Sequence, residues 1–561
     1  MLPESFRSFP DSGIQLLTPC LLLLTTFPIV CYTSSMSEIR NLPIGIQSFE
    51  EIRTKGCVYV DKTQFIRPLL SVGKPYFLSR PRRFGKSLFL STLKAYFEGK
   101  KDLFTGLEIS KTETEWKKYP VIYFDFNIGD FTDEENFRAS IGRKLDEYEK
   151  IYGIRNEKAT SPSDRFSGLI KQAHEKTGLQ AAILIDEYDK PLLNAIGHEG
   201  LVDRFRMILK SFYGVIKGED EHIRFVFITG VTRFDKVSIF SDLNNLNDIS
   251  LSERFTGICG ITQEELENCF VPEIKAIAEK NDLSEIKTLS ILKQNYDGYH
   301  FSQDTKTDVY NPFSLLNAFY NKSFGSYWFS TGTPTFLTVM MRDINFDYKS
   351  LEEGIEVGMR SLENYRLTAA DPLPMLYQTG YVTIKSYDKE FRSFTLGLPN
   401  DEVKYGLYES LIPFYAGYEE KSSNIEVLNF LSELRAGKVD AFMERINWIF
   451  ASAPKKTNQR KYELDCQAFV WLIFKLMGEF ILCEVQNGKG RSDAVVWEKN
   501  AVYIFEFKID GTAEEALAQI NSNNYPIAYM NEKAQGKKII KVGVNYSSTE
   551  EQLTNWLIEE E

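Results

Sequence analysis

The sequence predicts an α/β protein with a parallel, doubly wound sheet in its first half and a smaller α/β domain at its C-terminal end. Three observations predict this fold class. An apolar strand at 74–78 passes through a short loop into a helix, a second apolar run at 181–185 ends in two acids, and a hairpin at 494–508 carries charges on one face. Strands that alternate with helices favour a parallel sheet whose ligand lies at the carboxyl ends of the strands.

The loop after the first strand ends like a phosphate-binding loop. Its residues are Arg80, Pro81, Arg82, Arg83, Phe84, Gly85, Lys86 and Ser87. In the pattern G-x-x-x-x-G-K-[ST], backbone N–H groups cradle phosphates, the lysine reaches the β- and γ-phosphates, and the hydroxyl ligates Mg²⁺. Arg80 replaces the usual first glycine, whereas the last three residues keep this chemistry. The alternative is a basic surface turn, which the strand, loop and helix order disfavours.

The run Ala181–Ile185 is too short for a helix and suits a central parallel strand. It ends in Asp186 and Glu187, as a Walker B strand does. Asp186 is the candidate for the Mg²⁺ shell and Glu187 for the group that polarises the attacking water, so the pair predicts ATP hydrolysis. The alternative is a solvated strand end.

A further strand, Arg224–Ile228, is expected beside the Walker B strand. Thr229 and Thr232 follow it, and either hydroxyl is a candidate sensor of the γ-phosphate. An ordinary polar strand end explains each of them equally well. The run Val121–Phe126 predicts one more strand, with helices at 135–151 and 164–174 between the strands.

Three stretches of this sequence resemble the bacterial AAA-ATPase-like family. They are Phe77–Ser87, Val58–Thr63 and Asp186–Pro191. The resemblance runs from about Leu42 to near the C-terminus, and it implies that Arg80 is a regular variant of the loop. It also implies ATP and Mg²⁺ as cofactors and a PD-(D/E)xK nuclease-like domain at the C-terminus.

The C-terminal hairpin supports that implication from its own residues. Asp493 opens one strand, and Glu506 and Lys508 share a face of the next because strand side chains alternate. Metal-dependent phosphodiester cleavage needs hard oxygen ligands and a cation that steadies developing charge. Asp493 and Glu506 are therefore candidate metal ligands and Lys508 a candidate catalytic cation. The alternative is an exposed strand with a charged wet face.

Other residues near this hairpin are less clearly assigned. Glu484 and Glu463 compete as a further carboxylate, and Gln519 on a helix at 513–520 is placed to project toward the site. Several relatives of this nuclease fold have Gln and Tyr four residues apart. Here position 523 is Asn523, and the nearest aromatic residue is Tyr525.

The predicted organisation is a leader at 1–35, a P-loop domain at 36–255, a helical lid at 256–345, a linker with a winged-helix-like module at 346–425, and the nuclease-like domain at 426–561. The uncharged segment 12–37 could pass as a signal peptide or membrane anchor, but Pro19 and Pro28 weaken that interpretation. We expect translation to start at Met36 and no stable membrane association. Arg254, near the start of the lid, is either a phosphate-sensing cation or a surface arginine.

A net charge of −12 argues against a general nucleic-acid coat, so DNA binding would depend on local patches. Two lysine-rich clusters flank the nuclease-like site. They are Lys455, Lys456, Arg460 and Lys461 before it, and Lys533, Lys537, Lys538 and Lys541 after it. Both are more often solvated loops than DNA contacts. A cytoplasmic enzyme is expected, and homo-oligomerisation stays open.

Two classes of function fit these patterns. The first is an ATP-dependent nuclease in which the nucleotide state at Lys86 and Glu187 controls cleavage of nucleic acid, most readily DNA, at Asp493, Glu506 and Lys508. The second is a regulatory ATPase switch whose C-terminal domain binds nucleic acid or protein without cutting it. The complete D…E-x-K set favours the first class.

Overall fold

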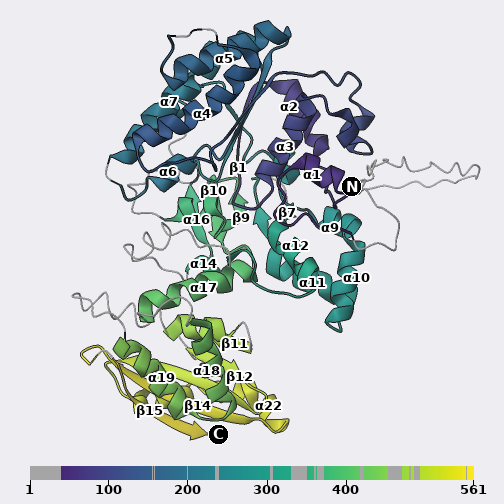
Figure 1. Cartoon of the computed structure of the whole chain (residues 1–561). Helices are drawn as coiled ribbons and strands as arrows, with labels where there is room; N and C mark the ends of the chain where they lie inside the picture. The colour runs from purple at the N-terminus through teal and green to yellow at the C-terminus, as the bar shows by residue number, and fades with distance from the viewer. Residues whose placement is uncertain are drawn as a thin grey trace, which may run out of the picture.

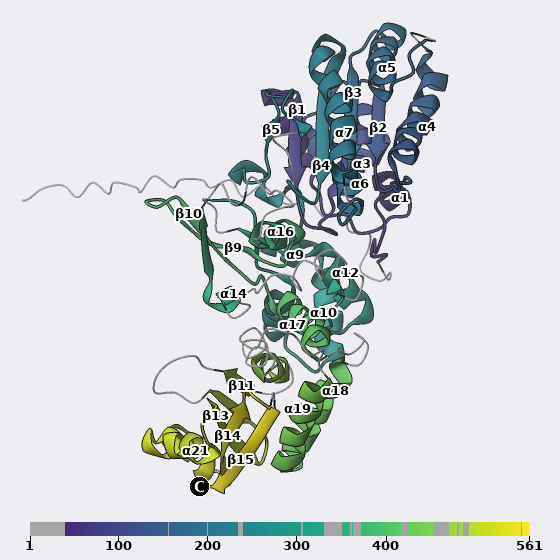
Figure 2. The same cartoon turned by 90° about the vertical axis from the view of Figure 1, so that its left-hand side faces the viewer.

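The computed structural model describes residues 40–154, 156, 158–198, 200–233, 239–303, 307–329, 350–358, 362, 372–416, 423–452, 470–478, 482–485, 493–550 and 552–561. The predicted leader at 1–35 lies outside these residues. Figures 1 and 2 show the ATPase-like sheet at one end of the molecule, the C-terminal sheet at the other, and a set of helices with a small sheet between them. No helix in the described ranges is both long and apolar enough to cross a membrane.

The first sheet has five parallel strands in the order β2-β3-β4-β1-β5. Its strands are β1 (Pro75–Ser79), β2 (Val121–Asp125), β3 (Ala181–Asp186), β4 (Ile223–Gly230) and β5 (Asn247–Asp248). The Walker B strand β3 is an interior strand, and the central strand β4 separates it from the P-loop strand β1. The predicted parallel α/β class is confirmed.

Helices cover both faces of this sheet. They are α1 (Phe49–Thr54), α2 (Ile66–Val72), α3 (Lys86–Phe97), α4 (Glu134–Tyr152), α5 (Pro162–Thr177), α6 (Lys190–Asn194) and α7 (Leu201–Gly218). Alternation along β1 sends Tyr76 and Leu78 into the apolar cluster that includes α3, and Phe77 into the cluster formed with α4, α5 and α7. A strand that is buried on both faces needs this continuous apolar sequence.

A helical region follows the sheet. It contains α9 (Gln263–Cys269), α10 (Val271–Lys280), α11 (Glu285–Tyr296) and α12 (Pro312–Asn321), with the short strands β6 (Tyr299–His300) and β7 (Asp308–Val309). Thr262 caps α9 in a reciprocal box with Glu265, which fixes where that helix begins. These helices lie in the stretch expected to form a lid, whose outer boundaries stay predictions.

The middle region contains helices and a small antiparallel sheet, in the stretch where the sequence predicts a linker with a winged-helix-like module. Its elements are α14 (Ser350–Glu353), β8 (Ile355–Gly358), α16 (Leu373–Thr379), β9 (Thr383–Asp388), β10 (Ser393–Gly397) and α17 (Asp401–Ala416). The three strands form an antiparallel sheet in the order β8-β10-β9. Helix α17 leads from this sheet toward the C-terminal domain (Figure 1).

The C-terminal domain has a mixed five-stranded sheet in the order β11-β12-β13-β14-β15, in which only β13 and β14 are parallel neighbours. Its strands are β11 (Leu482–Val485), β12 (Ala494–Trp497), β13 (Ala501–Ile509), β14 (Lys538–Ser547) and β15 (Gln552–Glu560), and its helices are α18 (Ser423–Arg435), α19 (Val439–Ser452), α21 (Ala513–Ser522) and α22 (Met530–Ala534). Helix α19 packs on one face of the sheet and α21 on the other (Figure 2).

Candidate active sites

The phosphate-binding loop connects β1 to α3. Gly85 precedes the helix with φ of +91°, a left-handed conformation that favours glycine. The buried Lys86 then directs Nζ back over the loop, where it donates to the carbonyl oxygens of Arg80 (3.1 Å) and Pro81 (3.2 Å). Its third contact is the Glu187 carboxylate, at 3.3 Å. The structure therefore brings the predicted P-loop lysine and the predicted Walker B glutamate together.

A cavity of about 590 Å³ lies beside Lys86, Ser87 and Glu187. This volume is within the usual range of small-molecule sites. Arg82, Arg83 and Gly85 from the loop also line it, as do Phe313 and Leu316 from α12. The helical region thus forms part of the cavity wall, as expected of a lid.

Asp186 ends β3 with its side chain fully buried. Its Oδ1 accepts a hydrogen bond from Thr229 Oγ1 at 2.8 Å. Burial and the Glu187 carboxylate raise the pKa of Asp186, while Ser87 and Lys86 act in the opposite direction. The contact between Ser87 and Asp186 is the pairing expected of two groups that share a metal shell.

Thr232 is directed to a different carboxylate. Its backbone N–H (2.7 Å) and hydroxyl (2.5 Å) both donate to Asp189 Oδ2. Burial, followed by the Glu187 charge, raises the pKa of Asp189 to about 6. Neither Thr229 nor Thr232 lines the cavity. A role of either residue in phosphate sensing would therefore act through Asp186 or Asp189.

The side chain of Arg80 also points away from the cavity. Its guanidinium is 1% exposed, donates to the carbonyl oxygens of Ser79 (2.9 Å) and Ser250 (2.7 Å), and lies 4.2 Å from the centre of the Phe301 ring. Burial lowers its pKa to about 10. The part of Arg80 that contacts a residue of the nucleotide site is its backbone carbonyl oxygen, which accepts a hydrogen bond from Lys86.

The other loop side chains divide between the cavity and the helical region. Arg82 and Arg83 line the cavity, and the Arg83 guanidinium lies 3.8 Å from the centre of the Phe313 ring. Phe84 packs edge-on against Tyr299 with ring centres 4.7 Å apart, and Pro81 is buried. The Phe84 side chain thus packs the loop against the helical region.

Several cavity residues were not singled out in the sequence, and three of them are polar residues at or just after the ends of strands β2 and β3. Asp125 and Asn127 lie at the end of β2, and Lys190 begins α6. Burial, together with the nearby charge of Arg82, lowers the pKa of Lys190. The sequence position of Asp125 and Asn127 could have indicated this role, because polar residues at the carboxyl end of a parallel strand face the ligand. Arg254, by contrast, lies outside this cavity and lines a second groove.

In the C-terminal domain the structure brings Asp493, Glu506 and Lys508 together. Lys508 Nζ lies 3.7 Å from the Glu506 carboxylate, and Asp493 Oδ2 accepts the Phe507 backbone N–H at 2.8 Å. Phe505, next to Glu506 on β13, is fully buried and packs against Phe474, with ring centres 5.0 Å apart. The strand alternation of polar and apolar residues thus places the charges on one face.

The Glu506 carboxylate is an unusual group for this position. It is 3% exposed, and burial followed by the Asp493 charge raises its pKa to about 7. Its Oε2 atom is buried without a hydrogen-bond partner. A hard divalent cation between Glu506 and Asp493 would supply that partner, so these residues fit the predicted metal. Neither predicted ligand set contains three carboxylates, and the described ranges contain no group of three or more His, Cys, Asp or Glu side chains arranged to hold a metal ion.

Gln519 belongs to this site. Its Nε2 donates to Glu506 Oε1, and its Oε1 accepts from Lys508 Nζ. The Tyr525 hydroxyl lies 3.4 Å from the same Nε2 and accepts from Asn523 at 2.9 Å. The aromatic residue is therefore displaced by two positions in sequence but still reaches Gln519. The short helical turn at Tyr525–Tyr529 accounts for this, because it folds back against α21.

The remaining candidates of this domain have different outcomes. Lys541 is buried and paired with Glu559 and Glu561, and Lys538 pairs with Glu560, so both lysines contact carboxylates of the chain itself. Glu484 lies on β11, opposite Val495. Glu463, Lys455, Lys456, Arg460 and Lys461 lie outside the described residues.

Comparison with known proteins supports both halves of this description. Residues 43–240 match a family described as "Predicted AAA-ATPase", and residues 461–556 match the PD-(D/E)XK nuclease superfamily. An uncharacterized protein from the vnfD 5′ region of Azotobacter chroococcum mcd 1 is 34% identical over 529 residues, which are 93% of this chain and 99% of the relative. The chain belongs to the AAA-ATPase-like family with a C-terminal PD-(D/E)XK domain. The resemblance inferred from the sequence motifs is confirmed.

One solved structure is also similar to this AAA-ATPase-like protein. It is the Aeropyrum pernix ORC1 protein in complex with DNA, at 11% identity and a TM-score of 0.22, covering 62% of this chain and 91% of that chain. A likeness of this degree carries no inference about function.

Proposed function

We propose that this protein binds and hydrolyses ATP at the Lys86 cavity and that its nucleotide state controls a metal-dependent nuclease at Asp493, Glu506 and Lys508. The observation that carries the proposal is the C-terminal cluster, in which a buried carboxylate without a partner on one oxygen stands beside a second acid and a lysine. DNA in the cytoplasm is the proposed substrate.

The ATPase half of the proposal rests on the cavity. Lys86 and the α3 N-terminus supply positive charge for phosphates, and Ser87 with Asp186 would hold Mg²⁺, which neutralises developing charge. Glu187, whose carboxylate contacts Lys86, would orient the attacking water. Arg82 and Arg83 add two cations to the cavity wall.

The nuclease half rests on four side chains. Asp493 and Glu506 would hold Mg²⁺, which polarises the phosphodiester and lowers the pKa of a bound water. Lys508 is oriented by Gln519, so its ammonium has a defined position beside the phosphate. Gln519 also holds the Glu506 carboxylate, which leaves only one of its oxygens for the cation.

Helix α17 connects the two sites by direct contacts. Glu402 accepts the backbone N–H of Trp328 at 2.7 Å, and the Trp328 indole N–H donates to the Arg82 carbonyl at 3.4 Å. One turn along α17, the Tyr405 hydroxyl donates to the Gly478 carbonyl at 3.3 Å. The helical segment before Gly478 carries Phe474, which packs on Phe505 and Phe507 of β13. These contacts give a physical basis for coupling.

The decisive experiment is a cleavage assay on labelled single- and double-stranded DNA and RNA with Mg²⁺ or Mn²⁺, with and without ATP. Lys508→Ala should reduce cleavage by at least about 100-fold, since it removes the catalytic cation. Lys499→Ala, which removes an exposed lysine from the turn of the same hairpin, should cleave like the unmodified protein. Undiminished cleavage by Lys508→Ala would exclude the proposed site.

A second set of variants tests the ATPase half independently. Glu187→Gln should bind ATP but lose turnover, and Lys86→Ala should lose both. The competing function is a regulatory ATPase switch whose C-terminal domain binds nucleic acid or protein without cleaving it. Metal-independent nucleic-acid binding without cleavage by the unmodified protein, with turnover intact, would establish that switch instead.

A further inference from the structure

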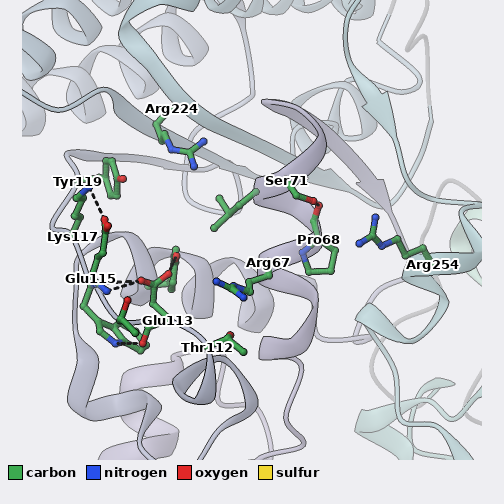
Figure 3. A pocket seen from close by; sticks show the side chains of 14 residues that line it. Arg67, Pro68, Ser71, Thr112, Glu113, Glu115, Lys117, Tyr119, Arg224 and Arg254 are labelled. Atoms are coloured by element: carbon green, nitrogen blue, oxygen red, sulfur yellow. Dashed lines mark hydrogen bonds and ion pairs between the residues drawn. The ribbon is translucent and has the colours of Figure 1, made fainter. Parts of the chain in front are cut away.

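A second groove, of about 650 Å³, lies on the ATPase-like domain away from the P-loop. Arg67 reaches it from α2, Arg224 from the second residue of β4, and Arg254 from the turn after β5 (Figure 3). Arg224 and Tyr119 lie where β4 and β2 begin, so the groove is at the amino-terminal edge of the sheet. The P-loop follows the carboxyl end of β1, at the opposite edge.

The three guanidinium groups have no carboxylate partner among the described residues. Several other arginines of this acidic chain are paired, for example Arg40 with Glu273, Arg165 with Glu149 and Arg233 with Asp248. Within the described part of the chain, Arg82 and Arg83 at the nucleotide cavity have no carboxylate partner either. Unpaired arginines thus line the cavity already expected to take phosphate, and they line this groove too.

The carboxylates of the groove are engaged elsewhere. Glu113 accepts the Tyr96 hydroxyl at 2.6 Å and the Glu115 backbone N–H at 2.9 Å, and Glu115 pairs with Lys117 at 2.6 Å. Figure 3 shows these contacts gathered on one side of the groove. The arginine charges are therefore not neutralised locally, and the groove has an excess of positive charge on a chain of net charge −12.

The chemistry of the lining identifies the ligand class. Guanidinium groups bind phosphate oxygens through paired N–H donors. Trp116 and Tyr119 line the same groove and offer aromatic surface of the kind on which bases stack. The volume suits a nucleotide-sized group.

We propose that the groove formed by Arg67, Arg224 and Arg254 binds the phosphate and base of a nucleotidyl ligand. The ligand is either a free nucleotide or part of a single-stranded nucleic acid, which share this chemistry. The site is separate from the ATP cavity and from the nuclease-like cluster. The proposal for this groove does not depend on whether the C-terminal domain cleaves nucleic acid.

Calorimetric titration of the full-length protein in EDTA tests this site without cleavage. The probes are thymidine 5′-monophosphate and a 5′-phosphorylated ten-residue oligothymidylate. The triple variant Arg67→Gln/Arg224→Gln/Arg254→Gln should weaken binding of the recognised probe at least tenfold. For the oligothymidylate, a plot of the logarithm of the binding constant against the logarithm of the salt concentration should become shallower. The slope should change by about 0.7 for each phosphate contact removed.

The matched control is Arg138→Gln/Arg143→Gln/Arg204→Gln, which removes the same charge from exposed positions on α4 and α7. This control variant should bind the two probes as the unmodified protein does. The affinity for ATP should be equal in both triple variants. Tighter binding of the strand than of the monophosphate identifies nucleic acid as the ligand, and equal binding identifies the free nucleotide.

Failure of both probes to bind, or equal binding by the two triple variants, would overturn the proposal. Because Arg224 is partly buried, the groove triple variant could fold poorly. The melting temperature detects this, and the single variant Arg254→Gln, at an exposed position, then gives the same test with a smaller change in salt dependence.

Discussion

At the scale of single residues, arginine has two different uses in the phosphate-binding loop. Arg80 is buried against Phe301 and the carbonyls of Ser79 and Ser250, whereas Arg82 and Arg83 line the cavity. Arg80, which replaces the usual first glycine, therefore anchors the loop through contacts on the side away from the cavity. The sequence does not distinguish the three arginines of this loop, and only the packing separates their positions.

Buried carboxyl groups give the clearest consequence of pH at this scale. Asp297, just before β6, is 3% exposed and has an unpartnered Oδ1. Burial raises its pKa to about 6, Asp308 adds to the shift, and Gly298, Lys293 and Lys385 oppose it. The folded-state pKa lies above the unfolded value of about 3.9. The folded protein therefore loses stability as the pH rises from about 4 to 6, and this loss persists above pH 6.

Asp297→Asn should remove that loss. We expect the variant to melt at a higher temperature than the unmodified protein at pH 7.5, by an amount worth at most about 3 kcal/mol, and to have no advantage at pH 4. Differential scanning calorimetry across this range measures it. Asp102→Asn, at an exposed position, is the control and should show no such pH-dependent difference. A variant less stable at pH 7.5 would contradict the assignment.

At the scale of elements, the nuclease-like site depends on how closely α21 lies against the sheet. Glu506 pairs in register with Gly543 of β14. A Cβ at Gly543 would lie 2.5 Å from the Ala513 carbonyl oxygen and 2.6 Å from the Leu517 nitrogen, both in α21. Thr512 and Glu515 cap the same helix reciprocally. Glycine at this position therefore lets α21 approach until Gln519 reaches Glu506 and Lys508.

Gly543→Ala should push α21 away from β14. Because the obstructing atoms are backbone, we expect a loss of stability of about 1–3 kcal/mol and a loss of cleavage larger than the loss of folded protein. Chemical denaturation and cleavage at equal folded concentration measure the two effects. Gly536→Ala is the control, because Gly536 has a left-handed backbone conformation and, among the described residues, no atom beyond its chain neighbours lies within 4 Å of an added Cβ. This variant should lose stability through backbone strain, whereas its folded fraction should cleave normally. Normal cleavage by Gly543→Ala would show that Gln519 does not need this approach.

At the scale of the whole molecule, a continuous apolar cluster extends from the P-loop domain through α17 to β13. Polar contacts accompany it, from the Arg82 carbonyl through Trp328 and Glu402 to Tyr405 and Gly478. Tyr408 adds a second contact, because its hydroxyl donates to Glu352, which also pairs with Lys475. The two predicted active sites thus share one packed connection.

Tyr405→Phe tests whether this connection transmits nucleotide state. It removes one hydroxyl and should reduce the stimulation of cleavage by ATP about threefold, while ATP turnover and ATP-independent cleavage stay the same. Cleavage rates with and without ATP give the ratio. Tyr320→Phe, on the exposed surface of α12, should leave the ratio unchanged. A parallel loss of both activities would indicate general destabilisation rather than coupling.

Much of the fold could be predicted because its signals are local. The strands β1, β3 and β13 are short apolar or alternating runs, and each leads directly into the polar residues of a site. Asp186, Glu187, Glu506 and Lys508 were identified for this reason. Asn127 was missed although it follows a predicted strand, and Lys190 was missed because it enters the cavity from the start of helix α6.

The sequence by itself determined the fold class, the family and the residue types of both predicted sites, because consecutive residues set strand periodicity and loop chemistry. Only the tertiary structure decided which of those side chains meet. It turned Arg80 away from the cavity, brought Tyr525 to Gln519 across a displaced spacing, and gathered Arg67, Arg224 and Arg254 into one groove. These are contacts between distant segments, whose positions depend on how helices pack on the sheets, and no local pattern records them.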